Sequence, residues 1–218
     1  MRMRGLVTGL VLAACTAYAP GALAAASPHP GADGCDHTKP AMASVKRSFS
    51  KPGTVLKRGE KAEILMVTSC GKLTIQLAQG KQNPIPNAIA FLVTKHFYDG
   101  LSIFRAVPDF VLQGGDPKNN GTGSPGFQVV GAPPSSYHYK VGDVAMAKTQ
   151  SAPNGSSGSQ FFLISGAQGA SLPLQYGVLG HAADKASLAT IARLNKFATA
   201  SQAPRKPLYI WSATLVKE

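Results

Sequence analysis

Hydrophobic and polar residues alternate in the part of the chain that follows residue 61, and this alternation predicts β-strands. In 72–77 the apolar residues Leu73, Ile75 and Leu77 are separated by polar ones, as in a strand with one buried face. The apolar run at 63–69 and the turn at Cys70-Gly71 complete a predicted hairpin. Further short apolar runs between Gly, Pro and Asn clusters are also predicted strands: 101–106, 110–113, 141–147, 160–165, 176–180 and 208–216.

Two segments repeat apolar residues with the period of an α-helix. The first begins near Ile85, carries Pro86 in its first turn, where proline is tolerated, and ends near His96. The second covers 184–197, with Asp184 as a candidate N-cap. Many short strands with only two helices predict a mainly β fold, a closed β-barrel.

The N-terminal residues have the pattern of an export signal. Arg2 and Arg4 precede an apolar run at 6–14, and a small-x-small motif follows at 22–24. We therefore predict a signal peptide at 1–24 and an exported protein, which is secreted, periplasmic or in the cell envelope.

A second interpretation of the same segment is a lipoprotein anchor. Leu12-Ala13-Ala14-Cys15 resembles a bacterial lipobox, whose Cys becomes the lipidated N-terminus of the processed chain. The protein would then be anchored through Cys15 and not released. In either case it leaves the cytoplasm.

Residues 25–60 are rich in Pro, Gly, Ser and Ala without periodicity, which predicts a flexible N-terminal arm before one domain at 61–218. The arm contains His29, Asp33, Cys35 and His37, but no second cluster at ligand spacing, so we expect no metal site. Cys35 and Cys70 are the only thiols left once Cys15 is removed or lipidated. In an oxidising compartment they would pair and tie the arm to the first strands. The alternative is a buried thiol at Cys70 and an exposed one at Cys35.

The chain is basic, with 22 Lys and Arg against 10 Asp and Glu and a net charge of +12. Such a surface can bind anionic polymers of the cell envelope. The cations are scattered and not interleaved with aromatic residues, so we expect no specific nucleic-acid binding.

Several spaced motifs carry a family resemblance. They are the run Phe104-Arg105-Ala106-Val107-Pro108-Asp109-Phe110-Val111-Leu112-Gln113-Gly114-Gly115-Asp116-Pro117, then Gly121-Thr122-Gly123, Met146-Ala147, Gly158-Ser159-Gln160-Phe161-Phe162 and Tyr176-Gly177-Val178-Leu179-Gly180. In order and spacing the chain resembles the cyclophilins, as an exported bacterial member. The resemblance covers about 61–218 and implies an eight-stranded antiparallel closed barrel with one helix capping each end. It also implies a peptidyl-prolyl cis-trans isomerase without a cofactor, acting in a groove on the outer face of the barrel.

The residues suit that chemistry. Rotation about an X-Pro bond has a barrier of about 18–20 kcal/mol, because the twisted amide loses its resonance. A catalyst must favour the twisted amide, whose nitrogen can accept a hydrogen bond. Arg105 matches the family's catalytic Arg, and its guanidinium is always charged and has several donors. Gln113 would hydrogen-bond the substrate backbone and hold Arg105 in place.

The resemblance also assigns the substrate contacts. An apolar slot for the proline ring is implied at Phe110, Val111, Phe162 and Leu172, with Tyr176 at its edge. Ala147 and Lys148 match the segment that pairs with the substrate backbone, and Gln160 borders the neighbouring pocket. Strand alternation places Phe161 in the core, on the face opposite Phe162.

Proline-containing peptides and unfolded exported proteins are the expected partners, and we expect a monomer. Ser171 stands where strong cyclosporin binders of the family carry Trp, and the only Trp here is Trp211, so cyclosporin binding should be weak. The alternative function is a module that binds proline segments on the same fold with little turnover. A hydrolase is the least favoured alternative, because no nucleophile motif organises the Ser, His and Asp residues.

Overall fold

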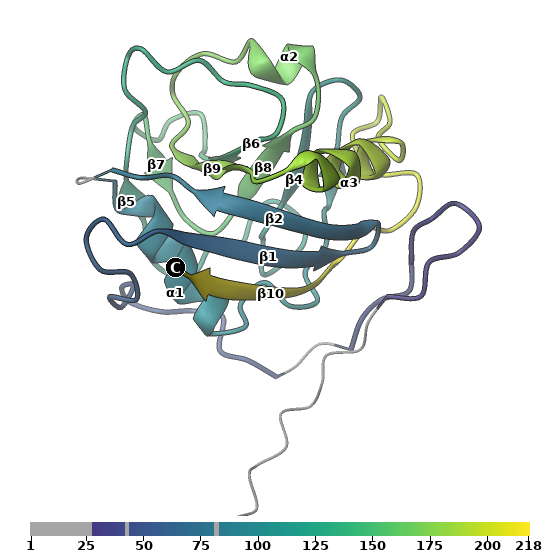
Figure 1. Ribbon diagram of the computed structural model, residues 1–218, viewed down its shortest axis with the longest axis horizontal. Coiled ribbons are helices and arrows are strands. Elements are labelled where there is room, and N and C mark those ends of the chain that lie inside the picture. The colour runs from purple at the N-terminus through teal and green to yellow at the C-terminus, as the bar shows by residue number, and fades with distance from the viewer. Residues whose placement is uncertain (1–27, 42–43, 81–82) are drawn as a thin grey trace, which may run out of the picture.

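A curled sheet of eight strands dominates the computed structural model, which describes residues 28–41, 44–80 and 83–218. Its strands follow the order β10-β1-β2-β9-β6-β8-β4-β3, and every neighbouring pair is antiparallel (Figure 1). They are β1 Ala62–Thr68, β2 Gly71–Leu77, β3 Arg105–Ala106, β4 Val111–Gly114, β6 Asp143–Met146, β8 Phe161–Ile164, β9 Val178–Ala182 and β10 Ile210–Lys217. Two more short strands, β5 Val129–Val130 and β7 Ser156–Ser157, pair with each other outside this sheet.

Side-chain alternation decides which face of the sheet is inside. Along β1 every second residue is buried, and Ile64 and Met66 point to the same interior as Leu73 and Ile75 of β2. This interior core continues under the helices through Ile89, Phe97 and Leu194. A second apolar cluster lies apart from it and includes Val111, Tyr139, Ala145, Phe162, Ile164 and Val178. Strands β4, β6 and β8 therefore bury apolar side chains on both faces.

The predicted closed barrel is wrong in one respect: the strand ladder does not close between β3 and β10. Only the bridge between Ser102 and Tyr209 joins the two edges as a β-pair, supported by isolated backbone hydrogen bonds such as Ile103 N–H to Leu208 C=O at 2.9 Å. On the β10 side, the N–H of Ala213 donates to the Asp99 carboxylate at 2.9 Å. Because a side chain takes that donor, no continuous strand pairing extends along this edge.

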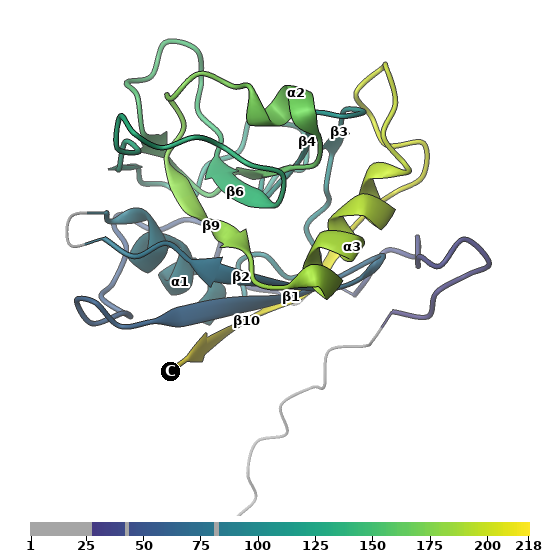
Figure 2. The ribbon, with the colours of Figure 1, turned by 45° about the horizontal axis from the view of Figure 1, so that its top comes forward.

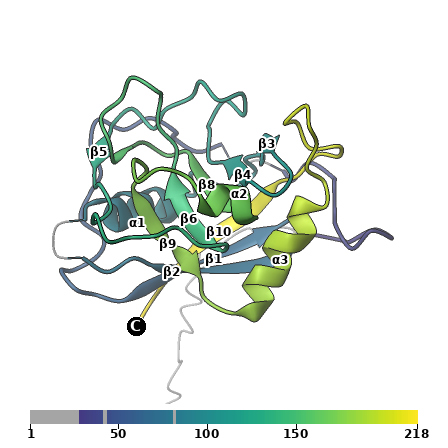
Figure 3. The same cartoon turned by 90° about the horizontal axis from the view of Figure 1, so that it is seen from above.

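Two longer helices pack at opposite ends of the curled sheet, as predicted (Figures 2 and 3). They are α1 Ile85–Thr94, which has proline near its start, and α3 Lys185–Asn195, whose N-cap Asp184 accepts the Ser187 N–H at 2.7 Å. A third, single-turn helix, α2 Ala167–Ala170, was not predicted. It is too short to show an apolar period, which is why the pattern missed it.

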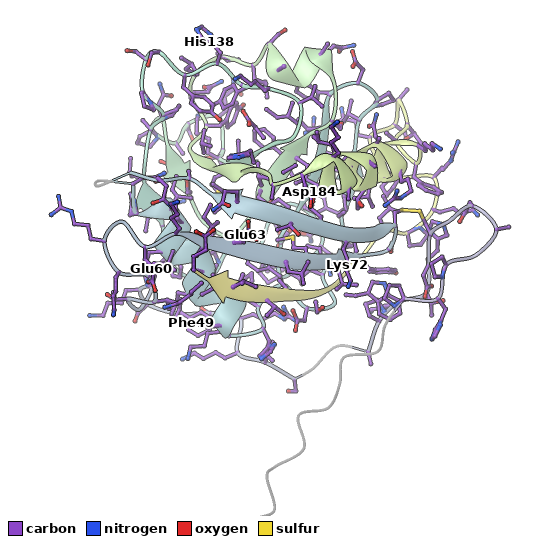
Figure 4. All side chains as sticks on the ribbon, in the orientation of Figure 1. Phe49, Glu60, Glu63, Lys72, His138 and Asp184 are labelled. Atoms are coloured by element: carbon purple, nitrogen blue, oxygen red, sulfur yellow. A yellow bond between two sulfur atoms is a disulfide. The ribbon has the colours of Figure 1, made fainter. Side chains whose placement is uncertain are left out.

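Residues 28–41 and 44–60 contain no helix or strand, but they lie against the domain, which differs from the flexible arm predicted for 25–60. The predicted disulfide is present and joins Cys35 to Cys70 at the β1–β2 turn (Figure 4). Further along, Arg47 donates to backbone carbonyls of 97 and 99, and Asn87 of α1 accepts the N–H groups of 55 and 56. The pattern could not reveal these contacts, because each pairs residues distant in the sequence.

The predicted signal peptide at 1–24 and the lipobox Cys15 lie outside the described residues. Within those residues, no helix is both long and apolar enough to span a bilayer.

Candidate active site

A cavity of about 190 Å³ opens on the outer face of the sheet, where β3, β4 and β8 lie side by side. It is lined by Arg105, Phe110, Val111, Gln113, Ala147, Lys148, Phe162, Leu172 and Tyr176. The structure thus brings together every predicted site residue except Gln160, which lies directly behind the cavity against Gln113.

Strand register explains why the polar and apolar parts of the site meet. Arg105 of β3 stands opposite Gln113 of β4, and Gln113 stands opposite Phe162 of β8. Directly paired residues of antiparallel strands point to the same face of a sheet. One row therefore presents a cation, an amide and an aromatic ring to the same cavity. Phe161 points the other way into the interior core, as alternation predicted.

The Arg105 guanidinium is held in place by two side chains. Its Nε donates to Gln202 Oε1 at 2.7 Å, and one terminal nitrogen donates to Gln113 Oε1 at 3.3 Å. The guanidinium also lies 5.7 Å from the centre of the Phe110 ring. Burial lowers the pKa of Arg105 from its ordinary value, but an arginine remains charged at any physiological pH. The remaining N–H donors are free to meet a ligand in the cavity.

Gln113 belongs to a directional chain of amides. Its Oε1 accepts from Arg105, and its Nε2 donates to Gln160 Oε1 at 3.1 Å. Gln160 Nε2 in turn donates to the carbonyls of Gly121 and Gly123, at 3.1 and 3.0 Å. Arg105 at one end can only donate and the two carbonyls at the other end can only accept, so the amides of Gln113 and Gln160 have one orientation. Gln160 therefore positions Gln113.

The loop that anchors this chain depends on a buried carboxylate. Asp116 is fully buried and accepts the N–H groups of Lys118, Asn120 and Gly121. A Cβ at Gly123 would lie 1.9 Å from Asp116 Oδ1, so only glycine fits there. The motif at 121–123 thus serves the loop and supplies the carbonyls for Gln160.

The apolar wall of the cavity consists of three aromatic rings and aliphatic side chains. The ring of Phe162 packs edge-on against Tyr176, with 5.2 Å between centres, and Val111 is 2% exposed beside them. Tyr176 is fixed through its backbone: the Tyr139 hydroxyl donates to its carbonyl at 2.6 Å and accepts its N–H at 3.1 Å. Burial raises the pKa of Tyr139, so the hydroxyl keeps its proton for this role.

The segment at Ala147 and Lys148 forms one rim of the cavity. The N–H of Ala147 donates to the Gln160 carbonyl at 2.9 Å. The next N–H, that of Lys148, takes part in no backbone hydrogen bond in the described part of the chain, and it can pair with an extended peptide. The Lys148 ammonium lies 5.9 Å from the centre of the Tyr176 ring.

The sequence did not predict roles for Tyr139 and Gln202. Tyr139 bonds to Tyr176, 37 residues further along the chain, and Gln202 bonds to Arg105 across 97 residues. The sequence carries no local signal for either residue, and the positive φ of Gln202, 69°, appears in the structure alone. Across 28–41, 44–80 and 83–218, no group of three or more His, Cys, Asp or Glu side chains is placed to hold a metal ion.

Comparisons with known proteins agree with this geometry. The family model described as cyclophilin type peptidyl-prolyl cis-trans isomerase/CLD matches residues 64–215. Peptidyl-prolyl cis-trans isomerase B of Bacillus subtilis is 39% identical over 74 residues, which cover 34% of this chain and 50% of that protein. Peptidyl-prolyl cis-trans isomerase B of Streptomyces anulatus is 34% identical over 92 residues, which cover 41% of this chain and 50% of that protein. The chain spans about half the length of these curated relatives.

Solved structures share the fold. A cyclophilin type peptidyl-prolyl cis-trans isomerase of Cryptosporidium parvum superimposes with a TM-score of 0.62 at 22% identity, over 73% of this chain and 99% of that one. The crystal structure of that protein in the presence of the dipeptide Ala-Pro gives a TM-score of 0.61 at 21% identity, over 72% of this chain and 99% of that one.

Proposed function

The chain belongs to the family of cyclophilin-type peptidyl-prolyl cis-trans isomerases, and from this premise we propose that it accelerates rotation about X-Pro peptide bonds. The observation that carries the proposal is the row of Arg105, Gln113 and Phe162 on one face of three neighbouring strands. This row sets a fixed cation beside an apolar slot of the size that a proline ring needs.

The chemistry requires no nucleophile and no cofactor. A proline ring in the slot against Phe162 and Val111 anchors one side of the X-Pro bond, while the residue before it is free to turn. As the amide twists, its nitrogen becomes pyramidal and gains a lone pair, which the free N–H groups of Arg105 can meet. Since the planar amide offers no such acceptor, this hydrogen bond stabilises the transition state more than the ground state.

Gln113 and the rim of the cavity orient the peptide. Gln113 holds the guanidinium from one side, and the free N–H of Lys148 can pair with a carbonyl of the bound peptide. Holding the peptide at the rim as well as in the slot lowers the entropic cost of placing the X-Pro bond beside Arg105.

The test is cis-to-trans isomerisation of a short Ala-Pro-Phe peptide by the chain from residue 25 onward, with its disulfide formed. Arg105→Ala should lower kcat/KM about a hundredfold or more, as does removal of a key donor in other transition-state sites. Arg105→Lys keeps the charge but not the planar fork, so its kcat/KM should lie between those of the parent protein and of Arg105→Ala. Circular dichroism must show that both variants are folded. Peptide binding without acceleration by the parent protein would leave the alternative function, a proline-segment binding module.

The proposal extends to location and partners. An exported protein that assists the folding of other exported chains is supported by the Cys35–Cys70 disulfide, since disulfides persist in oxidising compartments. Slow X-Pro isomerisation limits the folding of such chains. Mass spectrometry of the mature protein decides between release after 24 and a lipidated Cys15.

Two further partner predictions concern the surface and an inhibitor. The excess of cations supports binding to anionic polymers of the envelope, which salt should weaken. Weak cyclosporin binding is expected because Ser171 is an exposed residue at the end of α2 and Trp211 is buried in β10. A binding titration with cyclosporin tests this expectation.

A further inference from the structure

The cavity carries two positive charges and no negative one. Among its lining residues Arg105 and Lys148 are cations, and none is Asp or Glu. Two carboxylates near these residues along the chain are bound to other groups. Asp109, which precedes Phe110, accepts the Ala167 N–H at 2.8 Å, and Asp143 accepts the Tyr137 hydroxyl at 2.8 Å. The lining itself therefore presents only positive charge to a ligand in the cavity.

Lys148 is the part of this field that the family resemblance does not explain. Its position matches a segment that contacts substrate through the main chain, for which any side chain would serve. Here the side chain is a cation held at the cavity rim. Its Nζ donates to the carbonyls of Thr149 and Ala152, at 3.3 and 3.1 Å, and lies over the Tyr176 ring. These neutral partners fix the ammonium without cancelling its charge.

The ammonium is not paired with an acid. The ion pairs found among the described residues involve Lys206 and Lys217 but not Lys148. It is also close to the reaction, because the Tyr176 ring beneath it packs on Phe162, which forms the wall of the slot. A side chain next to a bound proline would lie within reach of this charge.

We propose that Lys148 makes the site select proline segments that carry an acidic side chain next to the proline. This inference rests on the proposed isomerase function and adds the substrate class. A Glu or Asp beside the proline gains attraction from Lys148 and Arg105, whereas a Lys or Arg is repelled. Because the ammonium is preformed at the rim, little side-chain entropy is lost on pairing.

The experiment compares peptides that differ only in charge beside the proline. Acetylated and amidated Ala-Glu-Pro-Phe and Ala-Gln-Pro-Phe place the acid before the proline, and Ala-Pro-Glu-Phe and Ala-Pro-Gln-Phe place it after. The ratio of kcat/KM for Glu over Gln is measured within each variant, so a change in overall rate cancels. We expect a ratio of about five in at least one of the two peptide pairs at low salt, the effect of one partly exposed charge pair. High salt should bring it close to one.

Variants at position 148 assign the ratio to this side chain. Lys148→Met should reduce it to less than about two, Lys148→Arg should keep it, and Lys148→Glu should favour the Gln peptide. Lys95→Met is the matched control, because Lys95 also lies over a ring, at 5.7 Å from the centre of Phe91 on α1, but lines no part of this cavity. Its ratio should equal that of the parent.

The outcomes separate the two proposals. A parent protein that accelerates the Gln peptides but shows no Glu preference overturns this inference and leaves the isomerase intact. A preference that persists in Lys148→Met overturns the role of Lys148. No acceleration of any peptide overturns the proposed function, and with it the inference.

Discussion

At the scale of single residues, Arg105 depends on a partner from a distant loop. Gln202 accepts the Arg105 Nε–H at 2.7 Å, and its own backbone carbonyl accepts the N–H of Ala106 at 2.7 Å. The second contact ties the loop to β3, so the side chain of Gln202 is brought to the strand that carries Arg105. Together with the hydrogen bond from a terminal nitrogen to Gln113, the contact with Gln202 holds the guanidinium in one orientation toward the cavity.

Replacing Gln202 should therefore reduce kcat more than it changes KM. Gln202→Ala removes one hydrogen bond of about 0.5–1.5 kcal/mol, which corresponds to a two- to tenfold lower kcat if Arg105 is less often placed for the twisted amide. Gln202→Glu keeps the acceptor and should retain most of the rate. Because Gln202 has a φ of 69°, Gln202→Gly relieves the backbone and still removes the acceptor. A Gly variant with full activity would show that the side chain does not position Arg105.

The site residues that the sequence predicted lie in segments that the family resemblance assigns, whereas Tyr139 and Gln202 do not. Arg105, Gln113 and Phe162 lie on strands, where alternation and a family motif fix which face they occupy. Tyr139 and Gln202 lie on loops, and their hydrogen bonds exist only because the fold closes distant segments on each other. No local pattern encodes such a contact, since loop conformation has no period.

At the scale of elements, helix α3 begins on a carboxylate whose ionisation matters. Asp184, at the start of α3 in Figure 4, accepts the Ser187 N–H, and this backbone hydrogen bond lowers the pKa of Asp184 below its ordinary value of 3.8. A group with a lowered pKa in the folded state stabilises the fold above its unfolded value, and that contribution is lost as pH falls through the folded value.

Asp184→Ala should lower the melting temperature by a few degrees at neutral pH, because the helix loses its N-cap. The gap between the parent and the variant should narrow as pH falls below 3.8, where the carboxylate of the parent becomes protonated. Thermal unfolding between neutral and acid pH measures both. Asp184→Asn keeps the cap without titrating and should stay close to the parent at neutral pH. A gap that is constant with pH would contradict the role of the charge.

The longer elements show a period in the sequence, and this period predicts them. The hairpin of β1 and β2 and the helices α1 and α3 have seven to eleven residues each, and all were predicted. Helix α2 and strands β5 and β7 have two to four residues, show no pattern of their own and were not predicted. Strands β3, β4, β6 and β8 are equally short, but they overlap the apolar runs predicted at 101–106, 110–113, 141–147 and 160–165. The missing closure between β3 and β10 was not predicted for a different reason. The Asp99 carboxylate accepts the N–H of Ala213 in β10, and this contact depends on tertiary structure.

At the scale of the whole molecule, most acidic side chains are tied to the backbone. Eight of the ten carboxylates accept backbone N–H groups: Asp33, Asp36, Glu60, Asp99, Asp109, Asp116, Asp143 and Asp184. Most hold loops or a helix end in place. These carboxylates keep their negative charge, so the net charge of the chain stays at +12, with 22 Lys and Arg against 10 Asp and Glu.

The disulfide joins the arm to the rest of the molecule, and its removal is the last prediction. Cys35 and Cys70 are 35 residues apart, so the bond restricts the unfolded chain by up to about 4 kcal/mol in the chain-entropy model. It also fixes the arm next to the hydrogen bond from Asp36 N–H to the Ser69 carbonyl at 2.7 Å. No cavity-lining residue contributes to this region.

The double variant Cys35→Ser, Cys70→Ser should therefore unfold at lower denaturant concentration while its isomerase kcat/KM stays within about twofold of the parent. Urea unfolding of both proteins with and without reductant provides the measurement. Reductant should lower the parent's midpoint toward that of the variant and leave the variant unchanged. Equal midpoints in oxidising buffer would mean that the arm adds nothing to global stability. A large loss of activity in a folded variant would instead show that the arm supports the catalytic face.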